Sequence, residues 1–268
     1  MAFIEIDGGG GVLTGAGSGI GRATAVELAR RGMRLVVSDV LAERAAETAA
    51  IINDAGGEAV SLAVDVTEVA ELEVLRETCL GQFGTLDLVM NNVGVIAMGP
   101  PESLPLAEWQ RVVDINLLGM VRSNLVFLPH LIEQGRGHVV NTASVSGLLA
   151  HGFDRLPYVT TKHAVVGMSE SLALYLRPQG IGVTCVCPSG VATNIVEQIS
   201  FFGPATRPRS PDHPIVGPEV VGRLVADAVE SDRFLVLTVP EVVDELVERA
   251  TDIERYVRVR SRPDEEQP

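Results

Sequence analysis

The chain has 268 residues, 46% of them hydrophobic, and its 21 basic and 35 acidic residues give a formal net charge of −14. This length supports one large α/β domain, and the acidic balance argues against nucleic acid or an anionic membrane as a partner. The amino terminus has no basic stretch followed by an apolar run, and no apolar run reads as long enough to cross a bilayer. We therefore expect a cytoplasmic protein without membrane contact. The three cysteines lack metal-ligand spacing, so we predict no metal site.

Strand-like and helix-like runs alternate along the chain, which is typical of a parallel sheet wrapped by helices. The expected strands are Gly11–Thr14, Arg34–Ser38, Ala59–Val64, Leu86–Met90, His138–Asn141, Gly182–Cys187 and Phe234–Leu237. The expected helices are Ile20–Arg31, Ala42–Ala55, Val69–Phe83, Leu106–Gln134, Tyr158–Arg177, Pro218–Glu230 and Pro240–Val259. We predict one three-layer, doubly wound α/β domain over residues 1–260, built on a seven-stranded parallel sheet with helices on both faces, and a disordered tail over 261–268.

The first strand-to-helix turn, Thr14–Gly21, is rich in glycine. Glycines there let the backbone approach a pyrophosphate, whose charge is met by the N-terminus of the following helix. The spacing fits T-G-x-x-x-G-x-G through Gly15, Gly19 and Gly21 rather than G-x-G-x-x-G. The strand before this turn starts with four glycines, Gly8–Gly11, which predicts an irregular start.

An acidic residue, Asp39, ends the second expected strand, eighteen residues after Gly21. A carboxylate at this place accepts hydrogen bonds from both ribose hydroxyls and repels a 2′-phosphate. Neither Ser18 nor Val40 is basic, and Arg22 is interpreted as a surface or capping charge. The sequence therefore favours NAD over NADP. The alternative is that Asp39 only caps the next helix.

Polar residues also follow the third and fourth expected strands. Asp65 and Val66 are placed to meet an adenine ring, and the amides of Asn91–Gly94 to tie strand ends together or hold a ribose. Either pair alone would pass as loop chemistry. Their positions at the carboxyl ends of successive strands, where ligands bind in open α/β sheets, favour a role in binding.

The long expected helix Leu106–Gln134 contains Asn116 and Gly119, each of which costs up to about 1 kcal/mol relative to alanine in a helix interior. We predict a local opening of the helix at Asn116, with its carbonyl or its side chain holding a water molecule. The alternative is a polar residue at a helix–helix contact.

Tyr158 and Lys162 are four residues apart on an expected helix, so they share one face. A phenol titrates at a pH of about 10, and a nearby cation that shifts its pKa by two to three units stabilises the phenolate by about 3–4 kcal/mol. Alcohol–ketone interconversion needs such an acid/base. By itself the pair is a weak signal, and its alternative reading is an exposed aromatic residue beside a solvated lysine.

Taken in order, these motifs resemble the short-chain dehydrogenase/reductase family, in its subclass of about 250 residues, from Gly11 to about Leu237. The resemblance implies a Rossmann fold. It also implies that Ser144, rather than Ser146, polarises the substrate oxygen. The implied catalytic residues are Asn116 (water relay), Ser144, Tyr158 (acid/base) and Lys162 (Tyr158 pKa and nicotinamide ribose). The implied cofactor-binding residues are Gly15, Gly17, Ser18, Gly19, Ile20, Gly21, Asp39, Asp65, Val66, Asn92, Gly94, Tyr158, Lys162, Pro188, Val191 and Thr193.

The sequence departs from the family pattern in three places. Ser189 replaces the first glycine of P-G-x-V-x-T, and Val93 replaces the alanine of N-N-A-G. The interval from Ser144 to Tyr158 is one residue longer than the commonest spacing. A substrate lid is expected at about residues 194–216, and its apolar half indicates a hydrophobic alcohol or ketone.

The leading hypothesis is an NAD-dependent oxidoreductase for a hydrophobic secondary alcohol or ketone, alicyclic or steroid-like, that assembles as a homotetramer. A 3-oxoacyl-carrier-protein reductase is the alternative on the same fold, but the acidic charge and Asp39 count against it. A sugar epimerase or dehydratase would need a larger C-terminal region. A non-catalytic NAD-binding regulatory or scaffold protein is the alternative of another class.

Overall fold

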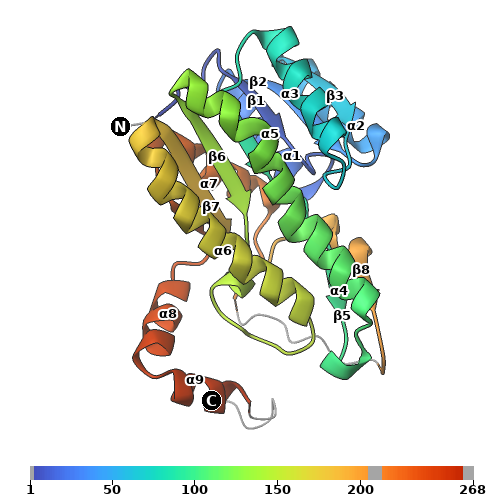
Figure 1. Ribbon diagram of the computed structural model, residues 1–268, viewed down its shortest axis with the longest axis vertical. Coiled ribbons are helices and arrows are strands. Elements are labelled where there is room, and N and C mark those ends of the chain that lie inside the picture. Colours follow the sequence, from blue (N-terminus) through green and yellow to red (C-terminus); the bar gives the residue numbers. More distant parts are fainter. Residues whose placement is uncertain (1–2, 205–212, 262–268) are drawn as a thin grey trace.

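The computed structural model describes residues 3–204 and 213–261 and contains a seven-stranded sheet in which every pair of neighbouring strands is parallel (Figure 1). The order across the sheet is β3-β2-β1-β4-β6-β7-β9. The strands are β1 (Gly10–Leu13), β2 (Arg34–Asp39), β3 (Ala59–Ala63), β4 (Leu88–Asn91), β6 (Gly137–Thr142), β7 (Ile181–Cys187) and β9 (Leu235–Leu237). All seven predicted strands are present, so the predicted sheet is confirmed.

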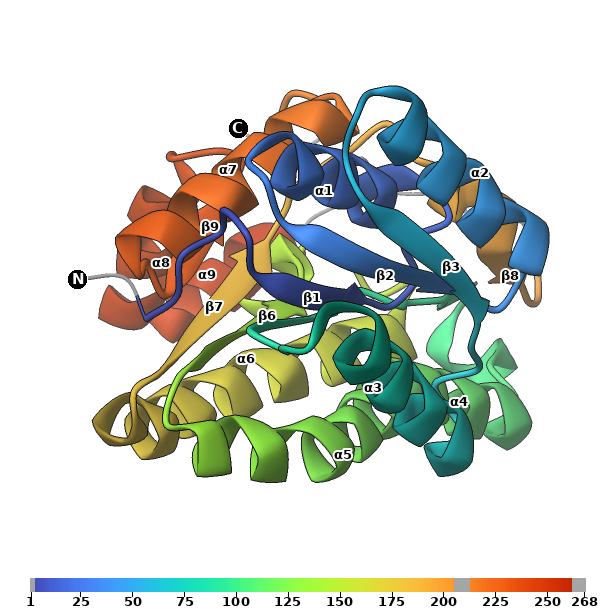
Figure 2. The same ribbon diagram turned by 90° about the horizontal axis from the view of Figure 1, so that it is seen from above.

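Helices cover both faces of this sheet, as Figure 2 shows. One face carries α1 (Gly19–Arg30), α2 (Ala42–Asp54) and α7 (Pro218–Ser231). The other carries α3 (Val69–Phe83), α5 (Gly119–Gln134) and α6 (Leu156–Leu176), and α4 (Leu106–Val113) precedes α5 and packs on α6. Side chains alternate between the faces of a strand, so Leu13 packs under α1 and α7 while its neighbour Val12 packs under α3 and α5. This is the predicted three-layer, doubly wound Rossmann fold.

The strand order reverses between β1 and β4. From β1 the chain builds outward to β2 and β3, then returns to β4 on the other side of β1. The loops that leave β1 and β4 at their carboxyl ends therefore diverge to opposite faces of the sheet. Such a switch point opens a crevice, and it is where ligands bind in open α/β sheets.

The glycine run before the first turn is irregular only in its first half: Gly8 lies in a turn with a φ of 74°, and the regular strand β1 begins at Gly10. Gly10 and Gly11 pair in register with Arg34 and Leu35 of β2, and both glycines are buried. A Cβ atom on Gly10 would lie 2.3 Å from the carbonyl oxygen of Thr85, so the backbones pack too closely for a side chain. The glycines thus permit close packing rather than fraying the strand.

The long predicted helix is interrupted by a π turn, η2 (Asp114–Leu118), between α4 and α5. There the Gly119 N–H donates to the carbonyl of Asp114, five residues earlier, so the predicted local opening at Asn116 is confirmed. An 18-residue window within the combined run 106–134 has a mean hydropathy of 1.3, so this run is long and apolar enough to cross a membrane by length and composition, which corrects the expectation of no such run. Its residues Phe127 and Leu131 are instead buried against the sheet.

The sequence did not predict a second, two-stranded parallel sheet formed by β5 (Ile96–Met98) and β8 (Ile199–Phe201). The expected lid thus begins with a short helix, η5 (Asn194–Gln198), and a strand, while residues 205–212 lie outside the described residues. The remaining short 3-10 helices are η1 (Pro101–Ser103), η3 (Val145–Gly147) and η4 (Arg177–Gln179).

The final expected helix is two helices, α8 (Val242–Thr251) and α9 (Ile253–Arg260). The break falls at Asp252, whose side chain accepts a hydrogen bond from the Arg255 N–H and so caps α9. Both helices lie at the lower left of Figure 1, below the carboxyl ends of the central strands. The expected tail is described only to residue 261, and 262–268 lie outside the described residues.

Candidate active site

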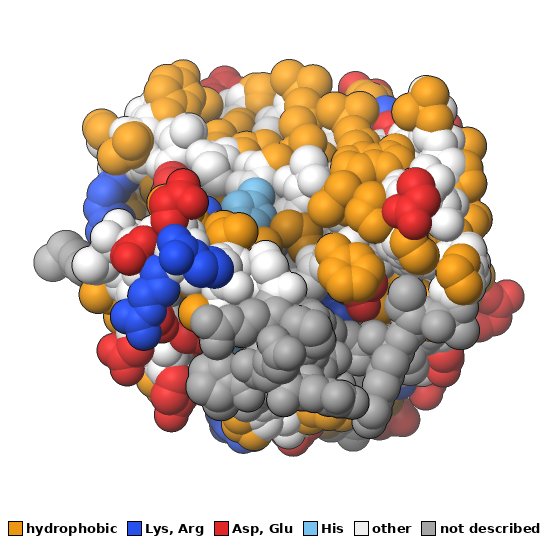
Figure 3. Space-filling model, turned by 90° about the horizontal axis from the view of Figure 1, so that it is seen from below, with side chains coloured by type: hydrophobic (Ala, Val, Ile, Leu, Met, Phe, Trp, Pro, Cys, Tyr) orange, Lys and Arg blue, Asp and Glu red, His pale blue; other side chains and the backbone are white. Residues whose placement is uncertain are grey.

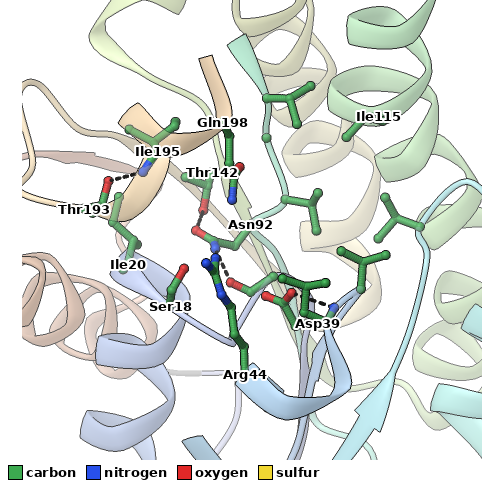
Figure 4. A pocket seen from close by; sticks show the side chains of 18 of the residues that line it. Ser18, Ile20, Asp39, Arg44, Asn92, Ile115, Thr142, Thr193, Ile195 and Gln198 are labelled. Atoms are coloured by element: carbon green, nitrogen blue, oxygen red, sulfur yellow. Dashed lines mark hydrogen bonds between the residues drawn. The ribbon is translucent and has the colours of Figure 1, made fainter. Parts of the chain in front are cut away.

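A cleft of about 480 Å³ opens at the carboxyl edge of the sheet, and Figure 4 shows the side chains that line it. Its walls come from the loops after β1, β2, β3, β4, β6 and β7 and from α6. Most of the predicted cofactor-binding residues line it: Gly15, Ser18, Gly19, Ile20, Asp39, Asp65, Val66, Asn92, Gly94, Tyr158, Lys162, Pro188 and Thr193. The structure therefore brings together residues spread over most of the sequence.

Three predicted cofactor residues, Gly17, Gly21 and Val191, do not line this cleft. A Cβ atom on Gly17 would lie 2.6 Å from the Asp39 carboxylate, and one on Gly21 would lie 2.3 Å from the Gly15 carbonyl oxygen. These two glycines keep the turn tight and so give it its shape. Val191 lines a neighbouring cavity instead.

The glycine turn offers backbone groups suited to an anion. Helix α1 begins at Gly19, which lines the cleft, so the unpaired N–H groups of its first turn lie at the cleft wall. The side chain of Arg22 does not line the cleft, because it donates hydrogen bonds to the Gly17 carbonyl at 2.5 Å and to the Glu47 carboxylate at 2.6 Å. This agrees with the interpretation of Arg22 as a capping charge.

Asp39 stands where a ribose-binding carboxylate was predicted and also closes two turns. Its carboxylate oxygens accept hydrogen bonds from the N–H groups of Gly17 and Leu41, each 3.1 Å long. Leu41 is the residue directly before α2, so its hydrogen bond to Asp39 helps to fix the start of that helix. The alternative that Asp39 caps the helix is therefore correct in part. Oxygen lone pairs remain, because a carboxylate accepts about four hydrogen bonds.

A basic residue that the sequence reasoning missed, Arg44, lines the same end of the cleft. It lies in the first turn of α2 and is labelled in Figure 4. Its guanidinium pairs with Glu197 of η5 at 3.2 Å. The signal in the sequence is a basic residue in the first turn of the helix that follows Asp39. A cation here is able to meet a phosphate as well as Glu197.

The polar residues after β4 tie strand ends together. The Asn92 amide donates to the Gly15 carbonyl at 3.0 Å and accepts from the Thr142 hydroxyl at 3.1 Å. Asn91 donates to Asn141 of the adjacent strand at 2.9 Å. Of the two roles considered for these amides, the contacts in this structure are those of strand ties.

The side chain of Asn116 is completely buried. It forms hydrogen bonds with the backbone of Val95, which lies beyond β4, and with the Thr161 hydroxyl on α6. Its oxygen accepts from the Val95 N–H at 2.8 Å, while its amide donates to the Val95 carbonyl at 3.0 Å and to Thr161 at 3.3 Å. These contacts use both amide hydrogens, while Oδ1 retains one lone pair. The expectation that the carbonyl or the side chain of Asn116 holds a water molecule stays a prediction.

Lys162 is the single lysine of the chain, and its ammonium is buried. The Nζ atom donates to the Thr142 carbonyl at 2.7 Å and lies 5.6 Å from the centroid of the Tyr158 ring. Burial lowers the pKa of Lys162 to about 8. The lysine is thus still charged at neutral pH, next to Tyr158 on the predicted common face.

Burial raises the pKa of Tyr158, against the smaller opposing effects of Ser144 and Arg155. The expected lowering by Lys162 is absent in this arrangement, because loss of hydration outweighs every nearby positive charge. The neutral phenol is therefore the form present at pH 7, and it is able to donate a proton.

A second cavity of about 260 Å³ adjoins the cleft, and Tyr158 lines both. Ser144 lines this second cavity; its hydroxyl accepts from the Ser146 N–H at 3.1 Å. Most of the remaining wall is apolar, formed by Ile20, Ile96, Val145, Val159, Val191, Ile195 and Ile199. A dinucleotide-sized cleft, a shared tyrosine and a small apolar cavity are the parts that a hydride-transfer site requires.

Comparison with known proteins agrees with this geometry. The sequence profile of the family described as short chain dehydrogenase matches residues 12–201. The chain belongs to the short-chain dehydrogenase/reductase family. It is an oxidoreductase of that family, and such enzymes bind a nicotinamide cofactor.

Two relatives and one solved structure illustrate the likeness. The chain is 34% identical over 238 residues to cyclohexanol dehydrogenase of Acinetobacter sp. (strain SE19), covering 87% of this chain and 92% of that one. It is 36% identical over 189 residues to levodione reductase of Leifsonia aquatica, covering 69% and 70%. A short chain dehydrogenase/reductase from Burkholderia phymatum, solved in complex with NAD, has 32% identity and a TM-score of 0.84, covering 94% of this chain and 96% of that one.

Proposed function

We propose that the protein is an NAD-dependent oxidoreductase that interconverts a hydrophobic secondary alcohol and its ketone. The observation that carries this proposal is the place of Tyr158 at the border of the cleft and the apolar cavity. Lys162 lies on the cleft side and Ser144 on the cavity side. An acid/base so placed reaches a substrate oxygen whose carbon faces the cleft.

The residues of the cleft fit a nicotinamide dinucleotide. The first turn of α1 receives the pyrophosphate, Asp39 receives the adenosine ribose, and Lys162 the nicotinamide ribose, while Asp65 and Val66 border the adenine. NAD is favoured because the Asp39 carboxylate repels a 2′-phosphate. When bound, the cofactor supplies or accepts the hydride.

The chain's own residues then move one proton. In ketone reduction, the Ser144 hydroxyl orients the substrate oxygen and the Tyr158 hydroxyl donates its proton to it. In alcohol oxidation, the deprotonated form of Tyr158 accepts that proton, with the Lys162 ammonium 5.6 Å from the centroid of its ring. The π turn at Asn116 offers its carbonyl to a water molecule on the path by which the proton reaches solvent.

The walls of the second cavity support a hydrophobic substrate. Seven aliphatic side chains line it, and Phe153 and Phe201, near to lining residues in the chain, are more than half exposed. Figure 3 shows hydrophobic side chains gathered on the lower face of the molecule. The names of the relatives, a cyclohexanol dehydrogenase and a levodione reductase, support a cyclic alcohol or ketone.

A 3-oxoacyl-carrier-protein reductase is less well supported. An acidic carrier protein requires basic surface near the site, whereas this chain has a net charge of −14. A non-catalytic NAD-binding protein is also less well supported, because Ser144, Tyr158 and Lys162 are all buried around one point of contact between the two cavities.

We also infer a homo-oligomer, with a tetramer as the expected form. Helices α5 and α6 carry large apolar side chains that are exposed in the described part of the chain: Leu125 is 70% exposed, Leu174 82% and Tyr175 61%. Exposed apolar residues on adjacent helices indicate a protein contact surface, and a second copy of the chain fits it because both helices are long.

The experiment that tests the proposed chemistry is Tyr158→Phe. Loss of the hydroxyl removes the acid/base, so kcat for cyclohexanol oxidation should fall by about 10²–10⁴-fold. NADH binding, followed by fluorescence titration, should change by less than about threefold, since the aromatic ring remains. Tyr175→Phe, the same change on the exposed face of the same helix, is the control. Retention of more than a tenth of the activity by Tyr158→Phe would refute the acid/base role.

A further inference from the structure

Four polar side chains from distant parts of the chain meet at one wall of the second cavity. Ser189, from the loop after β7, lies 3.1 Å from Nδ1 of His213, and Nε2 of His213 lies 2.7 Å from Glu245 on α8. The other carboxylate oxygen of Glu245 lies 3.3 Å from Nε2 of His151. The two imidazole rings are nearly perpendicular, with centroids 5.9 Å apart. We call these four residues the Glu245 cluster.

The cluster lies beside the reacting groups. Ser189 and His151 both line the cavity that Ser144 and Tyr158 also line. Ser189 directly follows Pro188, whose carbonyl oxygen is 3.5 Å from the Ser144 hydroxyl. The serine that departs from the family's glycine therefore places a polar group in an otherwise mostly apolar cavity.

The carboxylate determines where the protons of the cluster lie. Burial acts to raise the pKa of Glu245, but hydrogen bonds from His213 and His151 outweigh it and the pKa is lowered, so the group is ionised. A carboxylate only accepts hydrogen bonds, and each Nε2 atom must therefore carry a hydrogen. In the neutral His151 ring Nδ1 is then an acceptor. The Ser189 hydroxyl and Nδ1 of His213 share one hydrogen bond, 3.1 Å long.

Two hydrogen-bond acceptors are left for a ligand. Burial lowers the pKa of His151, which keeps its ring neutral, and its Nδ1 has no hydrogen-bond partner within the described part of the chain. The Ser189 oxygen has two lone pairs, so it retains acceptor capacity whichever way its bond to His213 runs. A ligand group that binds at either position donates one hydrogen bond to it.

The charge around the cluster selects a neutral donor. Arg260 of α9 donates to the same oxygen of Glu245 as His151 does, at 2.5 Å, and so balances its charge. Arg155 also lines the cavity, and its charge is balanced by Asp154, whose carboxylate it pairs with at 2.9 Å, so neither charge is left to select an ionic ligand. His151, His213 and Glu245 are of types that bind metal ions, but no group within the described residues is arranged as a metal site. The Nε2 atoms of both histidines are already hydrogen-bonded to Glu245.

We propose that Ser189 and His151 form a second subsite that binds a hydroxyl group of the substrate, so that the substrate is a diol or a hydroxy-ketone. This rests on the proposed alcohol–ketone function. His213 and Glu245 are positioning residues, because Glu245 fixes the tautomer of His151 and His213 holds the Ser189 hydroxyl. Ser144 and Tyr158 take the reacting oxygen, and the subsite takes the other oxygen across the same cavity.

The test compares kcat/KM for NAD-linked oxidation of the isomeric cyclohexanediols with that for cyclohexanol. The wild type should favour at least one diol by about tenfold, since one or two added hydrogen bonds have this effect. Two variants should each bring the ratio of kcat/KM for the diol to that for cyclohexanol to about one. Ser189→Gly restores the residue of the family pattern, and His151→Phe keeps an aromatic ring but removes both ring nitrogens. Ser146→Gly is the matched control, because Ser146 lines the same cavity without joining the cluster.

The outcomes separate this inference from the proposed function. If no alcohol is oxidised and no ketone is reduced, the proposed function fails. If cyclohexanol is oxidised but no diol is preferred, or the preference survives in both cluster variants, the hydroxyl subsite is overturned. A gain with aminocyclohexanol instead of the diols would also overturn it. NADH titration of each variant checks that the cleft is intact, and Ser146→Gly should keep the wild-type ratio.

Discussion

Replacing Lys162 by methionine should make the protein more stable while it removes activity. The ammonium of Lys162 is buried, and burial lowers its pKa to about 8 from the usual 10.5. The fold therefore holds a charge that would be more stable in water. Methionine has a similar length and no charge, so it fits the same space without that cost.

The magnitude follows from the pKa shift. A displacement of this size corresponds to about 3 kcal/mol of unfavourable free energy for the charged form. Methionine also loses the hydrogen bond to the Thr142 carbonyl, and an unsatisfied buried carbonyl costs about 1–2 kcal/mol. We therefore expect Lys162→Met to raise the free energy of unfolding by about 1–2 kcal/mol at pH 7 and Tm by about 2–6 °C.

The difference in the free energy of unfolding between wild type and Lys162→Met should also depend on pH, in a direction that the pKa of Lys162 determines. Between pH 8 and about 10.4 the unfolded chain keeps a proton that folded Lys162 releases, so wild-type stability rises relative to the variant with increasing pH. Below pH 8 both states are protonated and the full cost is present. Urea unfolding of the cofactor-free wild type and variant at pH 7 and pH 9.5 measures this difference. A variant less stable than the wild type at pH 7, or a difference that does not shrink with pH, would refute the reasoning.

Three further outcomes are expected. Asp39→Ala should raise the ratio of kcat/KM for NADP⁺ to that for NAD⁺ at least about tenfold, because the repelling carboxylate is gone; a wild type that already prefers NADP⁺ would contradict the role of Asp39. Asn116→Ala should lower the free energy of unfolding by about 3 kcal/mol in urea titrations, since it strands the Val95 backbone groups. Leu125→Glu combined with Leu174→Glu should reduce the mass found by light scattering without altering the circular dichroism; a wild-type monomer would contradict the oligomer.

The fold and most of the cleft could be predicted because they depend on local patterns. Alternating runs of the two periodicities place the strands and helices, and the carboxyl ends of parallel strands must meet at one edge. The glycine turn, Asp39 and the Tyr158–Lys162 pair are each defined within a few residues of an element's end. Their positions in the cleft then follow from the sheet alone.

Features that depend on contacts between distant segments were not predictable from the sequence. The partner of Asn116 is a backbone segment at Val95, and β5 pairs with a strand a hundred residues later. Glu245 meets His151 because α8 folds back below the sheet, and no local pattern specifies that return. The pKa of Tyr158 was misjudged for a related reason: the helical spacing places a lysine nearby but gives no measure of burial.

The small β5–β8 sheet has a consequence for how new specificities arise. It is separate from the seven-stranded sheet, and β8 follows Thr193, the last predicted cofactor contact, by only a few residues. Residues 194–201 are therefore held by three residue pairs with β5, outside the main sheet, and Ile195 and Ile199 of this segment line the second cavity. We expect that replacing this segment with that of a relative alters which alcohols are accepted while Ser144, Tyr158 and Lys162 stay in place, so that substrate range and reaction type diverge at different rates.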